Sequence, residues 1–167
     1  VNMEAITLLL PTLTHYYSGE GDFYVNHRRT FADTLFSREK EDIFAIIDAG
    51  YDLAKDTGVF HNLGAIRDKE IWDKILEIVP LNTDVNGDAM LSAINHTNDE
   101  LIDYLIEKGA KLDGYSMESG AYVMHYAIDR YYKNPEYIIK LVKAGAPMNV
   151  QSLGHQDWYD ATKPRTG

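Results

Sequence analysis

The chain has 167 residues, of which 45% are hydrophobic, and this composition supports a single folded domain over residues 1–167 and argues against intrinsic disorder. It contains no cysteine, which excludes disulfides, thiolate metal sites and cysteine nucleophiles and is typical of a protein of the reducing cytoplasm. The 26 acidic and 16 basic residues give a net charge of -10. This charge opposes binding to nucleic acid phosphates, and it either favours a basic partner or only keeps the protein soluble.

Residues 3–30 are predicted to form an N-terminal capping helix and a loop that cover the end of a larger helical domain. The apolar run from Ile6 to Leu10 is ended by Pro11 and follows no basic residue. We interpret it as neither a signal peptide nor a membrane span, so we expect a cytoplasmic protein without membrane contact.

Two degenerate helix pairs are predicted next, over residues 31–57 and 58–86. The first pair would consist of a helix at 31–36 and a second helix that ends at Gly50, and in the second pair residues 58–66 lead into the second helix. Each second helix carries apolar residues on one face. These residues are Ile43, Phe44, Ile46 and Ile47 in the first pair and Ile71, Ile75, Leu76 and Val79 in the second. Val79-Pro80 occupies the position where the other pairs have Gly or Gly-Ala.

A repeat of about thirty residues fills the remainder of the chain, over 87–119 and 120–153. Residues 98–113 align with residues 134–149 without a gap, and both copies place apolar residues at the i, i+1, i+4, i+5 spacing of one helical face. Leu105 and Leu141 hold matching places in this pattern, so both are predicted to lie in the core. The other apolar positions are Leu101, Ile102 and Ile106 in one copy and Tyr137, Ile138 and Val142 in the other.

Glycine is expected to end the second helix of each copy. Gly109 and Gly145 are predicted to have positive φ, a conformation that residues with a Cβ resist. Upstream, residues 87–94 and 120–128 each indicate a turn followed by a short first helix. The positions that end the second helices, 50, 79, 109 and 145, are 29, 30 and 36 residues apart, and part of the last, longer interval is assigned to an insertion from Arg130 to Lys133.

The run Gly120-Ala121-Tyr122-Val123-Met124-His125-Tyr126-Ala127 resembles the Gly-x-Thr-Pro-Leu-His-x-Ala motif of the ankyrin repeat family, with Tyr122 and Val123 in place of Thr-Pro. The resemblance covers about residues 31 to 154, as roughly four degenerate repeats. It implies an all-α, ankyrin-like solenoid of stacked antiparallel helix pairs with projecting turns or hairpin fingers, which binds proteins and carries no catalytic chemistry. It also implies that His125 hydrogen-bonds backbone groups of the turns.

Tyrosine is concentrated near the end of the repeat. Of 12 tyrosines, six lie between residues 115 and 137. Tyr122 and Tyr137 are interpreted as turn and core residues. Tyr131 and Tyr132 lie in the insertion, where no core position requires them, so they are expected either to contact a partner or to shield the neighbouring unit.

The resemblance also implies where a partner binds. The positions that flank the turn glycine and those that end the first helix would line the concave side and the finger edge, and the inserted tyrosines lie beside them. Carried over to this chain, they are Asp56, Thr57, Val59, Arg67 and Asp68; Val85, Asn86, Asp88, Asn95 and His96; and Glu118, Ser119, Ala121, Asp129, Arg130, Tyr131 and Tyr132.

No pattern in the sequence indicates catalysis, a metal or a cofactor. The six histidines are scattered without a His-x-x-x-His pair, and no nucleophile with a base and no phosphate-binding loop is recognisable. We therefore expect no enzyme but a small stand-alone inhibitor, monomeric when free. Its partner would be another protein, for example a basic nuclease toxin neutralised by an immunity protein, or a host factor.

Two alternatives are a structural scaffold or self-associating subunit, and an acidic mimic of nucleic acid. The mimic is less favoured because the acidic residues do not form regularly spaced rows. Residues 154–167 form a tail in which Trp158 either covers the last helix pair or belongs to a partner-binding arm.

Overall fold

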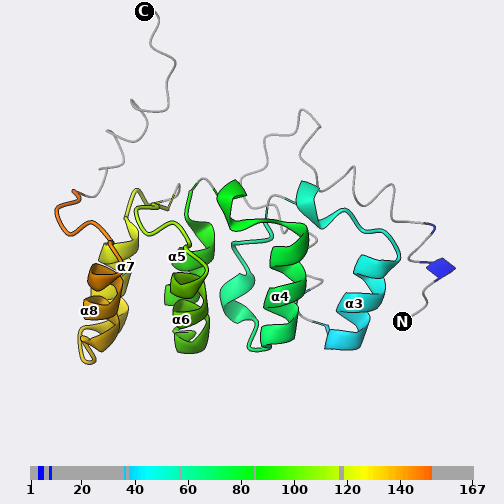
Figure 1. Cartoon of the computed structure of the whole chain (residues 1–167), viewed down its shortest axis with the longest axis horizontal. Coiled ribbons are helices and arrows are strands. Elements are labelled where there is room, and N and C mark those ends of the chain that lie inside the picture. Colours follow the sequence, from blue (N-terminus) through cyan, green and yellow to red (C-terminus); the bar gives the residue numbers. More distant parts are fainter. Residues whose placement is uncertain are drawn as a thin grey trace, which may run out of the picture. The chain divides into compact units, whose positions relative to one another are not determined.

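The structure, a computed structural model, describes residues 4, 5, 8, 36, 38–56, 58–84, 86–116 and 119–151 (Figure 1). The regular elements in this part of the chain are six α-helices and three short 3-10 helices, so the prediction of an all-α protein is confirmed. The chain divides into two compact units, Val1–Pro80 and Leu81–Gly167. The predicted cap at 3–30, the helix at 31–36 and the Trp158 tail lie outside the described residues, apart from single positions.

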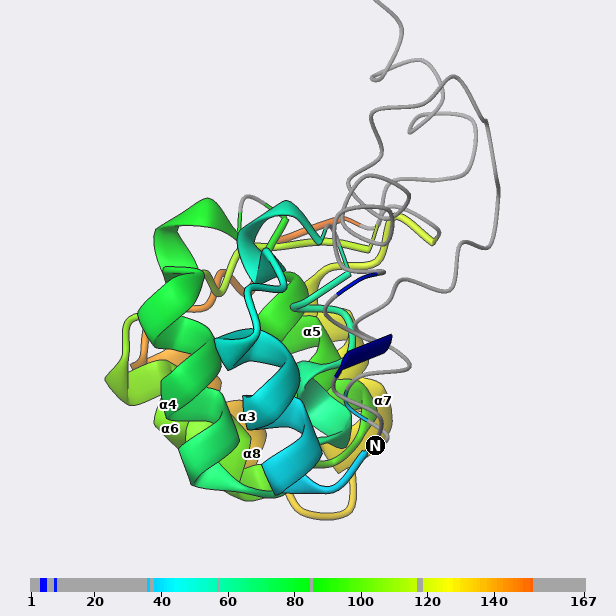
Figure 2. The same cartoon turned by 90° about the vertical axis from the view of Figure 1, so that its right-hand side faces the viewer.

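The first unit contains α3 (Lys40–Asp48), η1 (Leu53–Lys55), η2 (Leu63–Ala65) and α4 (Lys69–Ile78). Helix α3 buries Ile43, Ile46 and Ile47, and α4 buries Ile71, Trp72 and Ile75. Figure 2 shows α3 in front of α4, and ion pairs join the two helices, Lys40 to Glu70 at 3.0 Å and Lys74 to Asp48 at 3.2 Å. The second-helix faces predicted for residues 31–86 are therefore present.

Residues 58–66 form turns and the 3-10 helix η2, not the α-helix that the repeat pattern predicts for a first helix. The physical reason is local. Gly58 and Gly64 lose more backbone entropy in a helix than other residues, and Asn62 is a weak helix former. The side chain of Asp56 also holds the amide of Gly58 at 2.9 Å, which stabilises a turn.

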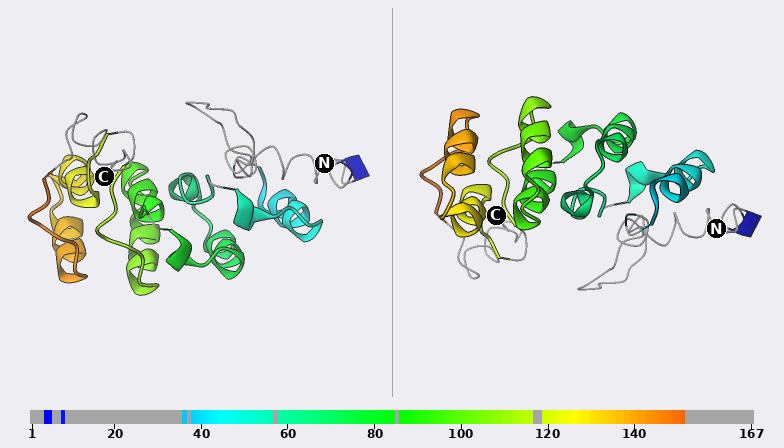
Figure 3. Two further views of the ribbon diagram at one scale, coloured as in Figure 1. Left: turned by 90° about the horizontal axis from the view of Figure 1, so that it is seen from above. Right: turned by 90° about the horizontal axis from the view of Figure 1, so that it is seen from below.

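The second unit contains η3 (Leu81–Thr83), α5 (Asp88–Asn95), α6 (Asp99–Glu107), α7 (Val123–Tyr131) and α8 (Glu136–Lys143). Helices α5 and α6 form one pair, α7 and α8 form another, and α5 packs against α7 (Figures 1 and 3). The matching residues Leu105 and Leu141 both have 0% exposure, which confirms their predicted place in the core.

The C-terminal ends of α3, α6 and α8 share the same backbone conformation and hydrogen bonds. Gly109 and Gly145 have φ of 75° and 103°, as predicted, and Gly50 in the first unit has φ of 104°. At all three ends the glycine amide donates to the carbonyl three residues back, at 3.0–3.1 Å, and the next amide donates to the carbonyl five residues back, at 2.9–3.3 Å. This pattern satisfies carbonyls that a helix end would otherwise leave without partners.

Helix α5 begins with a side-chain cap that the sequence interpretation did not include. Asp84 is 5% exposed and accepts the amides of Asp88 and Ala89 at 2.8 and 2.9 Å. Its carboxylate therefore occupies the positive end of the helix.

Glycine also brings the turns before α5 and α7 together. A Cβ on Gly114 would lie 2.2 Å from the carbonyl oxygen of Asn86, and one on Gly87 would lie 2.8 Å from the Cα of Gly114. The amide of Tyr115 donates to the same Asn86 oxygen at 3.1 Å. Only glycine allows this close approach of two backbones.

Candidate functional site

Backbone hydrogen bonds join the described residues on the two sides of the turn before α7. Tyr115 and Tyr122 form an isolated antiparallel bridge. Beyond it, Ser116 donates its amide to the carbonyl of Ala121 at 2.9 Å, and the amide of Gly120 donates to the carbonyl of Ser116 at 2.8 Å. Tyr115, Ser116, Ala121 and Tyr122 are therefore held in defined positions at the N-terminus of α7.

Aromatic side chains of this turn lie close together. The rings of Tyr115 and Tyr122 are 5.6 Å apart, and those of Tyr122 and His125 are 6.0 Å apart. The Tyr126 hydroxyl is hydrogen-bonded to the hydroxyl of Ser119 at 2.9 Å. All four rings are half-buried, so each presents part of its area to solvent.

His125 links the turn to α7 through hydrogen bonds with the backbone of Tyr122. Its Nδ1 accepts the amide of Tyr122 at 3.0 Å, and its own amide donates to the Tyr122 carbonyl at 2.9 Å. The expectation that His125 bonds turn backbone is confirmed. Because Nδ1 is the acceptor, neutral His125 carries its proton on Nε2.

Two large apolar side chains are exposed along α7. Ile128 is 52% exposed and Tyr132, at the C-cap, is 65% exposed. They are four residues apart and therefore lie on the same side of the helix, whereas Val123, Met124 and Ala127 are buried on the other side. We call the outward-facing set the α7 surface, and it comprises Tyr122, Tyr126, Ile128, Asp129 and Tyr132.

Tyr131 does not belong to this surface. It is 6% exposed, its ring lies 5.0 Å from that of Tyr137, and its hydroxyl donates to Asp99 Oδ1 at 2.6 Å. Of the two expectations for Tyr131, these contacts agree with shielding of the neighbouring unit and not with contact to a partner, and the expectation that no core position requires Tyr131 is wrong. Helix α7 has nine residues, against eight in α5, and its last residue, Tyr131, points inward between α6 and α8.

The other predicted positions of the second unit lie at helix ends. Asn95 and His96 are exposed at the C-terminal end of α5, and Asn86 and Asp88 are half-buried at its N-terminal end. Ser119 is exposed and Ala121 half-buried in the turn before α7, and Arg130 is exposed in the last turn of α7. Ser119, Ala121 and Arg130 thus adjoin the α7 surface along the chain, whereas the four α5 positions belong to a different helix.

In the first unit, two predicted contact positions are buried. Asp56 is 3% exposed and accepts the hydroxyl of Tyr51 at 2.7 Å as well as the amide of Gly58, and Val59 is 3% exposed. The expectation that both lie on a surface is wrong, because the turn that replaces the first helix directs them inward. Asp68 caps α4 by accepting the Glu70 amide at 2.9 Å, and Arg67 beside it is exposed. Thr57, Val85 and Glu118 lie outside the described residues.

Sequence reasoning missed the residue that makes the α7 surface apolar. Ile128 follows the buried Ala127 and lies four residues before Tyr132, so a helical projection of 123–132 could have identified it. The close contact at Gly114 had no comparable signal, because it depends on how two turns meet.

The described residues provide no group of three His, Asp or Glu side chains that could hold a metal ion. Within the same part of the chain, none of the helices has the length and apolar character needed to cross a membrane. Comparison with protein-family models, with curated proteins and with solved structures finds no match for this chain.

Proposed function

We propose that this chain is a non-catalytic, ankyrin-like protein-binding domain that acts as an inhibitor of the protein it binds. The observation that carries the proposal is the α7 surface, on which Ile128 and Tyr132 expose more than half of their area beside half-buried tyrosines. Leaving large apolar side chains in water is unfavourable, and an aromatic surface with an apolar centre is typical of protein-binding sites.

The ankyrin-like character of the proposal is supported by the helix pairs α5/α6 and α7/α8. Both pairs end in the same glycine hydrogen-bonding pattern, and the turns that precede them meet through glycine backbones. A stack of this kind projects its turns and first helices at one edge, which is where the α7 surface lies on the second pair.

Two properties support the inhibitor role: the hydrogen bonds beside the N-terminus of α7 and the negative net charge of the chain. Hydrogen bonds hold the described residues beside the N-terminus of α7, Tyr115, Ser116 and 120–122, so little conformational entropy would be lost when these residues are covered. A net charge of -10 would accelerate association with a basic partner, such as a nuclease or a basic host protein. We infer that the domain occludes such a partner, because no group on the α7 surface is arranged for chemistry.

The test is to compare three baits in capturing a partner from the source cell. They are the parent chain, Ile128→Asp and Tyr132→Ala, followed by measurement of Kd with the purified partner. The two substitutions should each weaken binding by about 2 kcal/mol, or about thirtyfold. Ile139→Asp is the matched control, because Ile139 on α8 is 51% exposed, like Ile128 at 52%. Equal Kd values for the parent, Ile128→Asp and Tyr132→Ala proteins would overturn the proposed surface.

A further inference from the structure

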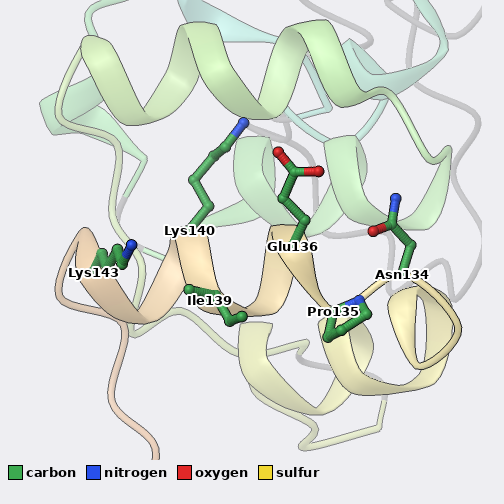
Figure 4. Close-up of a pocket in the computed structure, with 6 residues that line it drawn as sticks. All are labelled: Asn134, Pro135, Glu136, Ile139, Lys140 and Lys143. Atoms are coloured by element: carbon green, nitrogen blue, oxygen red, sulfur yellow. The ribbon is translucent and has the colours of Figure 1, made fainter.

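The outer side of α8 carries an open groove. It is lined by Asn134, Pro135, Glu136, Ile139, Lys140 and Lys143 (Figure 4). Ile139 is 51% exposed in its centre, and Glu136 and Lys143 are exposed toward its two ends. The groove is separate from the α7 surface, since it is formed by the second helix of the pair and by the connection before it.

The corresponding side of α6 is in contact with the next helix pair. In the repeat alignment Asp103 of α6 corresponds to Ile139 of α8, and Asp103 accepts Lys140 Nζ. Asp99, one turn earlier on α6, accepts the hydroxyl of Tyr131 at 2.6 Å. This side of a second helix is therefore a place where further helices make contact, and on α8 it carries an exposed isoleucine instead of a carboxylate.

The charges at the α8 groove balance one another. Lys140 is bound to Asp103, which leaves one acidic and one basic side chain, Glu136 and Lys143. Neither of these two is ion-paired with another residue that the structure describes. Because the whole chain has a net charge of -10, two copies repel each other, and this repulsion is smallest where the local charges cancel. The groove is thus a face on which a second copy can approach.

The spacing of these side chains makes the face self-complementary. Glu136 and Lys143 are seven residues apart, so they lie about 20° apart around α8 and about 10 Å apart along it. Ile139 lies near the midpoint, about 50° to one side of the line between them, and Lys140 lies to the other side (Figure 4). In an antiparallel pair with a twofold axis at this midpoint, each Glu136 faces the Lys143 of the other copy, and the two Ile139 side chains meet.

We propose that a second copy of the chain occupies the groove, in an antiparallel α8–α8 pair around a twofold axis beside Ile139. Two Glu136–Lys143 ion pairs flank the apolar contact, and each Lys140 stays bound to Asp103 of its own chain. One helix of eight residues offers a small contact area, so the dimer is weak and forms at high protein concentration.

This inference goes beyond the proposed function and does not depend on it. The test below requires no partner protein and measures self-association only, so the α8 groove and the α7 surface can fail separately. The inference also differs from the expectation, based on the sequence alone, that the free chain is monomeric.

Sedimentation equilibrium of the full chain at low ionic strength tests the apolar contact. The parent should show a monomer–dimer equilibrium at concentrations up to about 1 mM. Ile139→Asp should raise the dissociation constant of the dimer at least about tenfold, because it places two carboxylates against each other. Ile128→Asp is the matched control, since Ile128 on α7 is 52% exposed, and it should leave the constant unchanged. Far-UV circular dichroism checks that each variant keeps its helices.

Charge exchange tests the antiparallel arrangement. Glu136→Lys and Lys143→Glu should each weaken self-association at least about tenfold, because each variant turns two attractive contacts into repulsive ones. An equimolar mixture of these two variants should associate like the parent, because every lysine then faces a glutamate of the other chain.

Three results would overturn the proposal. The first is a parent chain that stays monomeric at about 1 mM. The second is a dimer that is insensitive to Ile139→Asp. The third is a mixture of Glu136→Lys and Lys143→Glu that associates no better than either variant alone.

Discussion

Glycine serves two different physical purposes in the second unit. Gly109 has φ of 75°, and a Cβ built on it meets no atom within 4 Å, so only its backbone conformation requires glycine. At Gly114, in contrast, a Cβ would overlap the carbonyl oxygen of Asn86 at 2.2 Å, so the requirement is steric. The two causes can be separated by choosing the replacement.

Gly109→Ala should lower the free energy of unfolding by about 1 to 2 kcal/mol, and Gly109→Asn should cost less, because asparagine tolerates the left-handed region. At Gly114 the order should reverse, since the larger asparagine adds to the overlap with Asn86. Urea unfolding of Gly109→Ala, Gly109→Asn, Gly114→Ala and Gly114→Asn measures these changes in the free energy of unfolding. The same rank order at both positions would contradict the distinction.

Asp84 is buried, and its side chain also caps the N-terminus of α5. Burial raises the pKa of its carboxyl above the ordinary value of 3.8, while hydrogen bonds from the amides of Ala89 and Asp88 oppose this shift. Because the pKa of Asp84 is higher in the folded chain than in the unfolded chain, protonation of its carboxyl favours folding. This contribution is fully present below pH 3.8 and is lost as the pH rises through the folded-state pKa.

We therefore expect an NMR titration to give a pKa above 3.8 for Asp84 in the folded chain. Asp84→Asn, which keeps one acceptor oxygen for the α5 amides, should remove this part of the pH dependence of the unfolding free energy. Glu100→Gln, which removes an exposed carboxylate from the first turn of α6, is the control for the general loss of a negative charge. A pKa below 3.8 would show that the helix cap outweighs burial.

At the scale of elements, α7 buries Tyr131 and exposes its neighbour Tyr132. Tyr131→Phe removes the hydrogen bond to Asp99 and should cost about 1 to 3 kcal/mol of stability, because the acceptor is charged. Tyr132→Ala should change stability by less than about 0.5 kcal/mol. In combination with Asp99→Ala, which removes the acceptor, the Tyr131→Phe change should lose most of its effect, and strictly additive losses would contradict the contact.

Leu105 of α6 has 0% exposure and lies in the core. Leu105→Ala should lower the unfolding free energy by about 2 to 5 kcal/mol, through lost burial and the cavity left behind. Glu107→Ala, on the exposed side of the same helix, is the control and should cost less than about 0.5 kcal/mol. Similar losses for both variants in thermal or urea unfolding would contradict the assigned core.

The sequence predicts the second helices of the pairs best, because their apolar period and their final glycine are both local signals. Leu105, Leu141, Gly109 and Gly145 therefore have the predicted burial and conformation. At residues 58–66 the local sequence does not follow the repeat pattern, and these residues form turns and the 3-10 helix η2 instead of an α-helix. Tyr131 was misplaced because an insertion can lengthen a helix as readily as a loop, and only the contact with Asp99 distinguishes the two.

At the scale of the whole molecule, the proposed binding to a basic partner predicts that the net charge of -10 acts on the association rate more than on the bound state. We expect the association rate with a basic partner to fall steeply as added salt shortens the Debye length from about 30 Å to about 8 Å. The dissociation rate should change little with salt, whereas Ile128→Asp should increase it at every salt concentration. Stopped-flow kinetics measures both rates, and an association rate independent of salt would exclude electrostatic steering.

The contact between the turns before α5 and α7 has a consequence for chemical ageing. Asn-Gly is a step at which asparagine deamidates, through attack of the glycine amide nitrogen on the asparagine side chain. In the folded chain the Gly87 amide donates to the Asp84 carbonyl at 3.3 Å, and the Gly87 backbone is confined by Gly114. We therefore expect rearrangement at Asn86 to be slower in the folded chain than in the unfolded chain, and to become faster in variants that loosen the contact between these two turns.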